Sequence, residues 1–304
     1  MEIVLEKIIN KNKNLTIEGK VADYIPVLSK ANPKDIGVTL IDNKGNLHKS
    51  GDYNKKFTIQ SISKVLTLML AIIDNGEEYV FERVGYEGTD DPFNTLYKLD
   101  LSYIDKPANP MINSGAILTT SLIKNKEEGR FNRILDIIRK ISKNPNISYN
   151  EEVYLSEKST GDKNRALVYT MKSRGMLEGN VEQILDDYFK QCSIEVDTVD
   201  LANIAFFLSN KCKGLEFYGK ITKEKLSSIL VGIMNNSGMY NFSGQYAVEV
   251  GIPSKSGVAG GIMGVVPSKV GIGVYSPALD KYGNSKVGYE IMKDLSKELN
   301  LSLF

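Results

Sequence analysis

The chain has 304 residues, of which 42% are hydrophobic and 25% charged, and its formal net charge is +1. This composition is typical of a globular protein with one large domain or two lobes, and it argues against a basic surface for nucleic acid. The N-terminal segment lacks a basic stretch followed by an apolar one, and no apolar run is long enough to span a membrane. We therefore expect a cytoplasmic protein without nucleic-acid or membrane partners.

The N-terminal part of the chain alternates short helices with a hairpin. Helices are predicted at residues 2–13 and 20–31. A β-branched strand at residues 36–41 turns back through the polar residues 43–46 toward a second strand at 57–60. His48, the only histidine, lies in this polar hairpin, where a solvated turn residue is expected.

The middle of the chain is predominantly helical. From residue 61 to about 236 the apolar residues mostly follow a 3.6-residue period. The clearest helices are predicted at residues 132–142, 166–172, 181–189, 201–208 and 223–234.

Strand patterns return near the C-terminus, before a closing helix. The strands are predicted at residues 251–254, 258–267 and 270–275, and the helix at about 285–299. Gly271-Ile272-Gly273 lacks the third glycine of a dinucleotide fingerprint, so a structural role is expected there.

The distribution of these elements predicts the domain organisation. Because the strands cluster at the two ends, we expect residues 1–60 and 237–304 to form an α+β sheet lobe. An all-helical lobe, residues 61–236, would be inserted between them, with the site at the lobe interface.

Ser61-Ile62-Ser63-Lys64 is the stretch most suggestive of chemistry, because it joins a predicted strand to an apolar helix that ends near Gly76. In a helix beginning near Ser61, Lys64 lies one turn further on and on the same face. The first turn of a helix favours negative charge developing on the hydroxyl, and burial pushes a lysine amine toward its neutral form. The interpretation is a serine nucleophile beside a lysine base.

A four-residue motif also occurs by chance, and Ser121-Leu122-Ile123-Lys124 is a second match. Ser61 is favoured by its strand-to-helix setting and by the segment Lys255-Ser256-Gly257-Val258-Ala259-Gly260-Gly261 further along the chain. Serine enzymes with Ser-x-x-Lys and Lys-Thr-Gly elements place such a strand opposite the nucleophile. Alone, this segment would be interpreted as a glycine-softened strand packed on a helix, so only the two motifs together indicate a hydrolase.

The residue types that are scarce restrict the mechanism further. A Ser-His-Asp hydrolase would need His48 as its base, and a histidine-rich metal site is impossible. Cys192 and Cys212 are too far apart to form a disulfide framework or a zinc motif. A covalent hydrolase with this sequence must therefore move protons with Lys or Tyr, and no metal or other cofactor is expected.

Six blocks of the sequence resemble the serine-dependent glutaminases. They are residues 60–64, 109–116, 156–164, 188–196, 237–245 and 255–261. The resemblance extends over nearly the whole chain, from about Tyr24 to Asp280, with the blocks in the same order. It implies a β-lactamase-like α+β fold, with an antiparallel sheet flanked by helices plus an all-helical lobe. It also implies a homo-oligomer that hydrolyses L-glutamine to L-glutamate and ammonia without a cofactor.

The resemblance also implies the roles of nine residues. Ser61 matches the nucleophile, Lys64 its base, and Tyr240 a tyrosine that helps to move protons. The substrate-contacting positions are matched by Tyr24, Ser61, Asn113, Glu157, Asn164, Tyr188, Tyr240 and Val258, the last through its backbone N–H. Ser114 and Lys163 stand at positions that vary in the family.

The chemistry of glutamine agrees with these side chains. Glu157 suits the α-ammonium group, and the Asn and Tyr side chains offer donors for the α-carboxylate. Simpler interpretations remain for each of them. Glu157 would otherwise be a solvated carboxylate beside Lys158, the asparagines cap or turn residues, and the tyrosines core aromatics.

Two other functions remain open for the whole chain. The first is another serine amidohydrolase of the β-lactamase-like fold, such as a cell-wall peptidase. The expected lack of a signal peptide and of a Ser-Asp-Asn element between Lys64 and Lys255 argues against it. The second is a non-catalytic amino-acid-binding protein, which the presence of Ser61, Lys64 and Tyr240 together disfavours.

Overall fold

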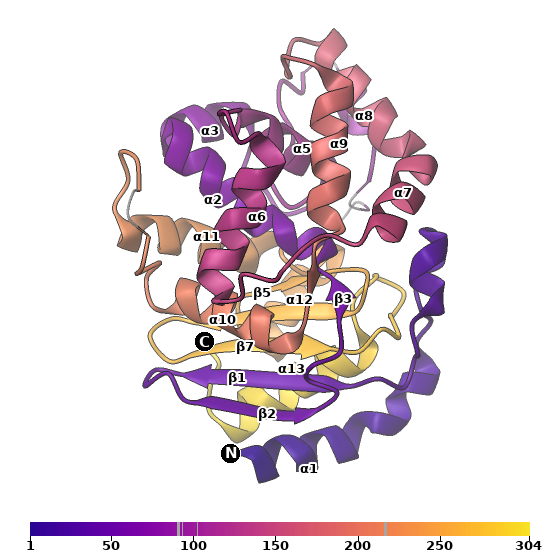
Figure 1. The fold of residues 1–304 in the computed structure, drawn as a ribbon, viewed down its shortest axis with the longest axis vertical. Helices are drawn as coiled ribbons and strands as arrows, with labels where there is room; N and C mark the ends of the chain where they lie inside the picture. The colour runs from indigo at the N-terminus through magenta and orange to yellow at the C-terminus, as the bar shows by residue number, and fades with distance from the viewer. Residues whose placement is uncertain (90–91, 93, 102, 216–217) are drawn as a thin grey trace.

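The computed structural model shows an antiparallel sheet with helices packed on both faces (Figure 1). It describes residues 1–89, 92, 94–101, 103–215 and 218–304. The helices are α1 Glu2–Asn12, α2 Ser63–Asn75, α3 Glu77–Arg83, α4 Tyr97–Asp100, α5 Asn113–Leu122, α6 Arg130–Ser142, α7 Glu151–Thr160, α8 Asp162–Ser173, α9 Val181–Cys192, α10 Thr198–Ser209, α11 Lys223–Ser237, α12 Ser243–Glu249 and α13 Lys286–Glu298. The short 3-10 helices are η1 Lys13–Glu18, η2 Pro26–Lys30, η3 Gln60–Ile62 and η4 Tyr240–Phe242. The strands are β1 Gly37–Asp42, β2 Leu47–Gly51, β3 Phe57–Thr58, β4 Glu195–Val196, β5 Ser254–Ser256, β6 Gly261–Val266 and β7 Val270–Tyr275.

The main sheet has the strand order β2-β1-β7-β6-β5, and each neighbouring pair is antiparallel. Thr39 on β1 lies opposite Gly273 on β7, so strands from the two ends of the chain meet in one sheet. The edge strand β5 carries the Lys255-Ser256 part of the downstream motif. The division of the chain into a sheet lobe and an inserted helical lobe stays a prediction.

Side chains on the strands alternate between two hydrophobic cores. Val38, Leu40 and Ile272 pack with α1 and α13 on one face of the sheet. Met263 and Val265 join the larger core formed with the central helices. Successive strand residues point to opposite faces of the sheet, and each face is covered by one of these two cores. Both faces are therefore buried, which explains the nearly continuous apolar runs in β6 and β7.

Helix α10 packs directly on β7, and two glycines permit the close approach. A Cβ atom on Gly271 would lie 2.2 Å from the backbone nitrogen of Phe206, and one on Gly273 would lie 2.3 Å from the Thr198 carbonyl oxygen. Any larger residue would push the helix away from the strand. The structural role predicted for this glycine pair is therefore confirmed.

Helix α2 lies at the centre of the larger core. Residues 63–73 are all buried, as expected for a helix that is apolar on every side. The prediction of a helix beginning near Ser61 and ending at Gly76 is confirmed, with the 3-10 turn η3 leading into it. None of the helices that the structure describes is long and apolar enough to cross a membrane.

Several predicted elements differ from the structure. Residues 20–31 form only the short helix η2, because Ile25 before Pro26 is extended and Lys20 pairs with Leu279 instead. The strand at 57–60 is reduced to β3, which pairs with β4 outside the main sheet. The strand predicted at 251–254 is displaced to β5, with only Ser254 in common, and the strand predicted at 258–267 is shortened to β6, with a turn between the two. The helices α3, α4, α5, α7 and α12 are not among those predicted individually, and each has ten residues or fewer.

Candidate active site

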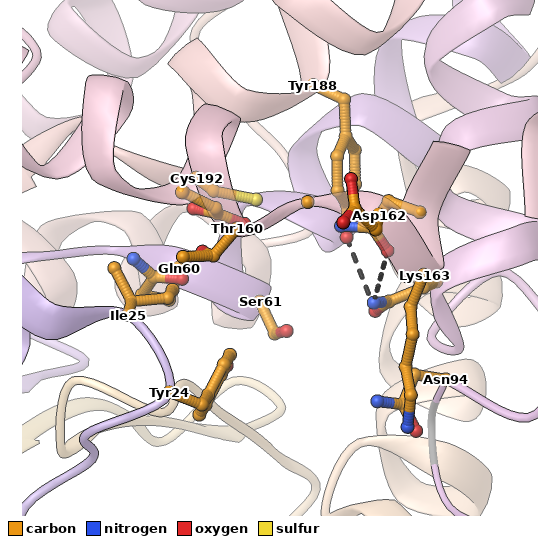
Figure 2. Close-up of a pocket in the computed structure, with 14 residues that line it drawn as sticks. Tyr24, Ile25, Gln60, Ser61, Asn94, Thr160, Asp162, Lys163, Tyr188 and Cys192 are labelled. Carbon is orange, nitrogen blue, oxygen red and sulfur yellow. Dashed lines mark hydrogen bonds between the residues drawn. The ribbon is translucent and has the colours of Figure 1, made fainter. Parts of the chain in front are cut away.

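A cavity of about 360 Å³ lies where α5, α7, α8 and α9 meet the segment around Ser61 (Figure 2). This volume is typical of small-molecule sites. Six of the predicted site residues line it: Tyr24, Ser61, Asn113, Glu157, Asn164 and Tyr188. Three predicted residues do not line it but lie behind or beside it: Lys64, Tyr240 and Val258.

Ser61 is presented by a strained turn. Gln60 has a φ of +48°, a left-handed conformation that is uncommon for a residue with a side chain. The Ile62 N–H donates to the Ile59 carbonyl at 3.1 Å, and the Ser63 hydroxyl donates to the Gln60 carbonyl at 2.8 Å. The backbone N–H of Ser61 therefore lies in the first turn leading into α2, where N–H groups have no partner within the helix. Figure 2 shows the Ser61 side chain pointing into the cavity.

Lys64 is fully buried one turn after Ser61. Its Nζ donates to the Met111 carbonyl at 3.0 Å and to Asn113 Oδ1 at 2.7 Å. Burial lowers the pKa of Lys64 from 10.5 to about 8, although the Glu157 carboxylate acts in the opposite direction. The amine is thus buried as predicted, and its role as a base stays a prediction.

Asn113 connects the lysine to the cavity wall. Its Nδ2 donates to Asn164 Oδ1 at 2.9 Å, and its Oδ1 accepts from the Tyr188 hydroxyl at 3.3 Å as well as from Lys64. Asn113 is the first residue of α5, and Asn164 lies in the first turn of α8. Since the N-terminal end of a helix carries partial positive charge, this side of the cavity suits an anionic group.

Glu157 places a carboxyl group in the cavity wall, where it suits a cationic group of a ligand. The residue is 8% exposed, and in the described part of the chain its Oε2 atom has no hydrogen-bond partner. Burial raises its pKa from 4.5 to about 8, although Lys64 and the Gln60 side chain act to lower it. A buried, unpartnered carboxyl oxygen at a cavity wall is a binding point for a cationic or donor group of a ligand.

Tyr240 reaches the nucleophile from the other side. It has a φ of +57°, and its side chain hydrogen-bonds with that of Ser61. Its hydroxyl also donates to the Ser256 carbonyl at 3.2 Å. Behind it lies Lys255, whose Nζ is 4.5 Å from the Tyr240 ring centroid and donates to the carbonyls of Gly238 (3.0 Å) and Ser256 (2.8 Å). Burial lowers the pKa of Lys255 well below its ordinary value, so this second amine also favours the neutral form.

Val258 lies in a tight turn and not in the strand predicted for it. The Gly260 N–H donates to the Gly257 carbonyl at 2.9 Å, which leaves the Val258 N–H outside the hydrogen bond that closes the turn. Gly260 has a φ of +102°, and a Cβ atom there would lie 2.4 Å from the Ser276 carbonyl oxygen. A Cβ on Gly257 would lie 2.8 Å from the carbonyl oxygen of Ile59, so the turn packs against the segment that precedes Ser61.

Eight residues that the sequence motifs did not assign to the site also line the cavity. They are Ile25, Gln60, Asn94, Thr160, Gly161, Asp162, Lys163 and Cys192. All except Ile25 and Asn94 lie inside the blocks that resemble the serine-dependent glutaminases, which was the available signal. Burial raises the pKa of the Cys192 thiol well above its ordinary value, so Cys192 is a neutral wall of the site.

The serine of the second Ser-x-x-Lys motif and the single histidine both lie outside the cavity. Ser121 is on α5, and its hydroxyl donates to the Leu118 carbonyl at 2.7 Å, outside the cavity. His48 Nε2 is 3.6 Å from Asp42 Oδ2 on the hairpin of β1 and β2. Among the described residues, no group of three or more His, Cys, Asp or Glu side chains could hold a metal ion.

Comparison with known proteins agrees with this geometry. A family model described as Glutaminase matches residues 19–304. The chain is 53% identical to Glutaminase 2 of Clostridium perfringens, with 100% of both chains covered. It is 50% identical to the glutaminase of Clostridioides difficile, with 100% of this chain and 98% of that protein covered.

Solved structures extend the likeness to the fold. A probable glutaminase from Bacillus subtilis complexed with 6-diazo-5-oxo-L-norleucine has a TM-score of 0.88 at 34% identity, with 100% of this chain and 96% of that chain covered. A covalent complex between the Bacillus subtilis glutaminase YbgJ and 5-oxo-L-norleucine has the same score and identity, with 100% and 99% covered. The structural neighbours have the β-lactamase-like fold, so the predicted fold class is confirmed. The match of residues 19–304 to the family model and the identity to these relatives show that the chain belongs to the glutaminase family.

Proposed function

We propose that this member of the glutaminase family hydrolyses the side-chain amide of L-glutamine through an acyl-enzyme on Ser61, releasing ammonia and L-glutamate. One observation carries the proposal: Ser61 and Glu157, whose Oε2 atom has no hydrogen-bond partner among the described residues, line one cavity, and the buried amine of Lys64 lies behind it, hydrogen-bonded to the wall residue Asn113. The Bacillus subtilis relative that forms a covalent complex with 5-oxo-L-norleucine supports a nucleophilic mechanism. The scheme needs no metal or other cofactor.

In the first half of the reaction, Lys64 acts as the base. Because its two hydrogen bonds go to the Met111 carbonyl and to Asn113 Oδ1, a neutral amine keeps its lone pair for a third direction. Lys64 takes the hydroxyl proton as Ser61 Oγ attacks the amide carbon of the substrate. The N–H groups of Ser61 and Val258 hold the oxyanion, a role that usually contributes about 3–4 kcal/mol.

The leaving group and the water then complete the reaction. Tyr240, hydrogen-bonded to Ser61, relays the proton that Lys64 took from the serine to the departing nitrogen, so ammonia leaves as the C–N bond breaks and Lys64 is neutral again. Water then attacks the ester and gives up a proton to Lys64, which returns it to Ser61 Oγ as the ester C–O bond breaks and glutamate leaves.

The two charged ends of glutamine explain the rest of the cavity. The α-ammonium group lies against Glu157, whose carboxyl loses its proton as the cation approaches. Asn164 and Tyr188 hold the α-carboxylate near the helix starts of α5 and α8, and Asn113 keeps both in place. Tyr24, which is 53% exposed, closes the mouth of the cavity.

Cytoplasmic location and self-association belong to the same proposal. The free, buried Cys192 and Cys212 are consistent with a reducing compartment. Exposed apolar side chains, among them Ile3, Ile17 and Val248, are consistent with a homodimer or larger homo-oligomer. Light scattering behind a sizing column tests this, and a single monomeric peak with full activity would contradict it.

The acyl-enzyme is tested by chemical labelling. Treatment with 6-diazo-5-oxo-L-norleucine should stop ammonia release from glutamine and leave a 5-oxo-L-norleucine group on the peptide that contains Ser61. The label should be absent from Ser61→Ala and unchanged in Ser121→Ala. Labelling of any other residue in active protein would refute the assignment, and failure to release ammonia would favour a non-catalytic binding protein.

A further inference from the structure

A cluster of four side chains joins α7 to α9 behind the cavity. Lys158 and Lys190 donate to the two oxygens of the Asp186 carboxylate, at 2.6 Å and 2.7 Å. Tyr154 donates its hydroxyl to the same carboxylate and accepts from Lys158 Nζ at 2.9 Å. We refer to Tyr154, Lys158, Asp186 and Lys190 as the Asp186 cluster.

The carboxylate and the tyrosine of the cluster are largely buried, whereas the Lys158 side chain is 43% exposed and the Lys190 side chain 27% exposed. The Asp186 side chain is 18% exposed, and the Tyr154 residue is 8% exposed. The two ammonium groups lie 5.3 Å and 5.4 Å from the Tyr154 ring centroid. Burial acts to raise the pKa of Asp186, but the three donors lower it to about 2, so the carboxylate stays charged throughout the working pH range.

The cluster lies beside residues that form the cavity wall. On α7, Glu157 lies between Tyr154 and Lys158 in the sequence, next to the lysine. On α9, Tyr188 lies between Asp186 and Lys190. The distance between the Glu157 carboxyl and the Tyr188 hydroxyl therefore depends on the relative position of the two helices.

We propose that Asp186 is a positioning residue for the substrate's α-amino group: by tying α7 to α9 it holds Glu157 at the right distance from Tyr188. The inference rests on the proposed role of Glu157. Ser61, Lys64 and Tyr240 lie on other elements, so loss of the tie affects discrimination for the amino group more than the attack on the amide.

A second tie keeps α9 in place when Asp186 is altered. The neighbouring Asp187 accepts from Arg130 on α6 at 2.7 Å and from Gln183 Nε2 at 3.2 Å. Because this tie anchors α9 to a different helix, Asp186→Asn is expected to fold with a local shift of α7.

The test compares L-glutamine with 4-carbamoylbutanoate, which has the same amide and carboxylate but lacks the amino group. The kcat/KM for L-glutamine divided by the kcat/KM for 4-carbamoylbutanoate measures recognition of the amino group. In Asp186→Asn this ratio should fall roughly tenfold or more, as expected for a misplacement of about 1 Å, while hydrolysis of the analogue is nearly unchanged.

Asp294→Asn is the matched control. The Asp294 side chain is 15% exposed and accepts from Lys11 Nζ at 2.5 Å and from Asn12 Nδ2 at 2.7 Å, which ties α13 to α1 on the far face of the sheet. Its loss should lower the melting temperature without changing the substrate ratio. An unchanged ratio in Asp186→Asn, or an equal fall in Asp294→Asn, would overturn the inference.

Two further variants show whether a negative result comes from misfolding, from a wrong role for Glu157 or from a wrong role for Asp186. If Asp186→Asn does not fold, Tyr154→Phe removes one hydrogen bond of the cluster and is judged by the same ratio. Glu157→Gln should lower the ratio strongly, and adding Asp186→Asn to it should lower the ratio no further. If Glu157→Gln leaves the ratio intact, the proposed function of Glu157 is wrong; if only Asp186→Asn leaves it intact, the positioning role alone is wrong.

Discussion

Replacing Glu157 by Gln should stabilise the protein at pH 8 while it damages recognition of glutamine. In the folded protein the carboxyl has a pKa of about 8, against 4.5 when it is not buried. Between these two pH values the folded state binds a proton that the unfolded chain has released. The stability of the native protein therefore falls as the pH rises through this window, and a glutamine side chain, which does not ionise, removes that loss.

The magnitude follows from the size of the pKa change. Each pH unit within the window contributes about 1.4 kcal/mol, so Glu157→Gln gains at most about 4 kcal/mol at pH 8 and less than about 1 kcal/mol at pH 5. For a chain of this size 1 kcal/mol corresponds to a melting-temperature change of about 2 °C, or up to about 8 °C at pH 8. The increase at pH 8 should therefore clearly exceed that at pH 5.

Scanning calorimetry at the two pH values, with ammonia release measured on the same preparations, provides the assay. Glu249→Gln is a control of opposite sign, because hydrogen bonds from Tyr289, Gln245 and Lys293 lower the pKa of Glu249 to about 2. That variant should be destabilised by nearly the same amount at pH 5 and pH 8, because both values lie above the window between about 2 and 4.5, and the destabilisation should shrink only below about pH 4.5. Equal melting-temperature changes for Glu157→Gln at pH 5 and pH 8 would refute the burial argument, whatever happens to activity.

Three other predictions follow from the site. Ser61→Ala should abolish ammonia release and keep the native circular dichroism spectrum, whereas Ser121→Ala should be nearly silent; the opposite pattern would exclude Ser61 as the nucleophile. The pH profile of kcat/KM should rise with a limb near pH 8, because the pKa of Lys64 is about 8, and Lys64→Arg should be inactive because guanidinium stays protonated. Full activity in the arginine variant would exclude a lysine base. Gly260→Ala should lower both kcat and the melting temperature, since its φ of +102° and a Cβ only 2.4 Å from the Ser276 carbonyl oxygen force the Val258 turn to move; native kinetics in this variant would separate that turn from catalysis.

Local sequence patterns were sufficient to predict those helices and strands that depend mainly on residues close to one another in the chain. Apolar periodicity predicts the hairpin strand β1, the strand β7 and the helices α2 and α13, because one face or both faces of each element are buried. The Ser61-to-Lys64 spacing likewise places both residues on one helical face. The order of the motif blocks was enough to indicate the glutaminase family and its fold.

Only the tertiary structure decided the properties that depend on distant segments. The short strand β3 exists because β4 pairs with it, and no pattern within residues 57–60 specifies that partner. The turn that holds Val258 is constrained by its packing against Ile59 and Ser276, which lie far away in the sequence. The pKa values of Glu157 and Lys64 depend on how deeply several helices bury them. A sequence can name a carboxylate and an amine, but their protonation depends on the surroundings that the whole fold creates.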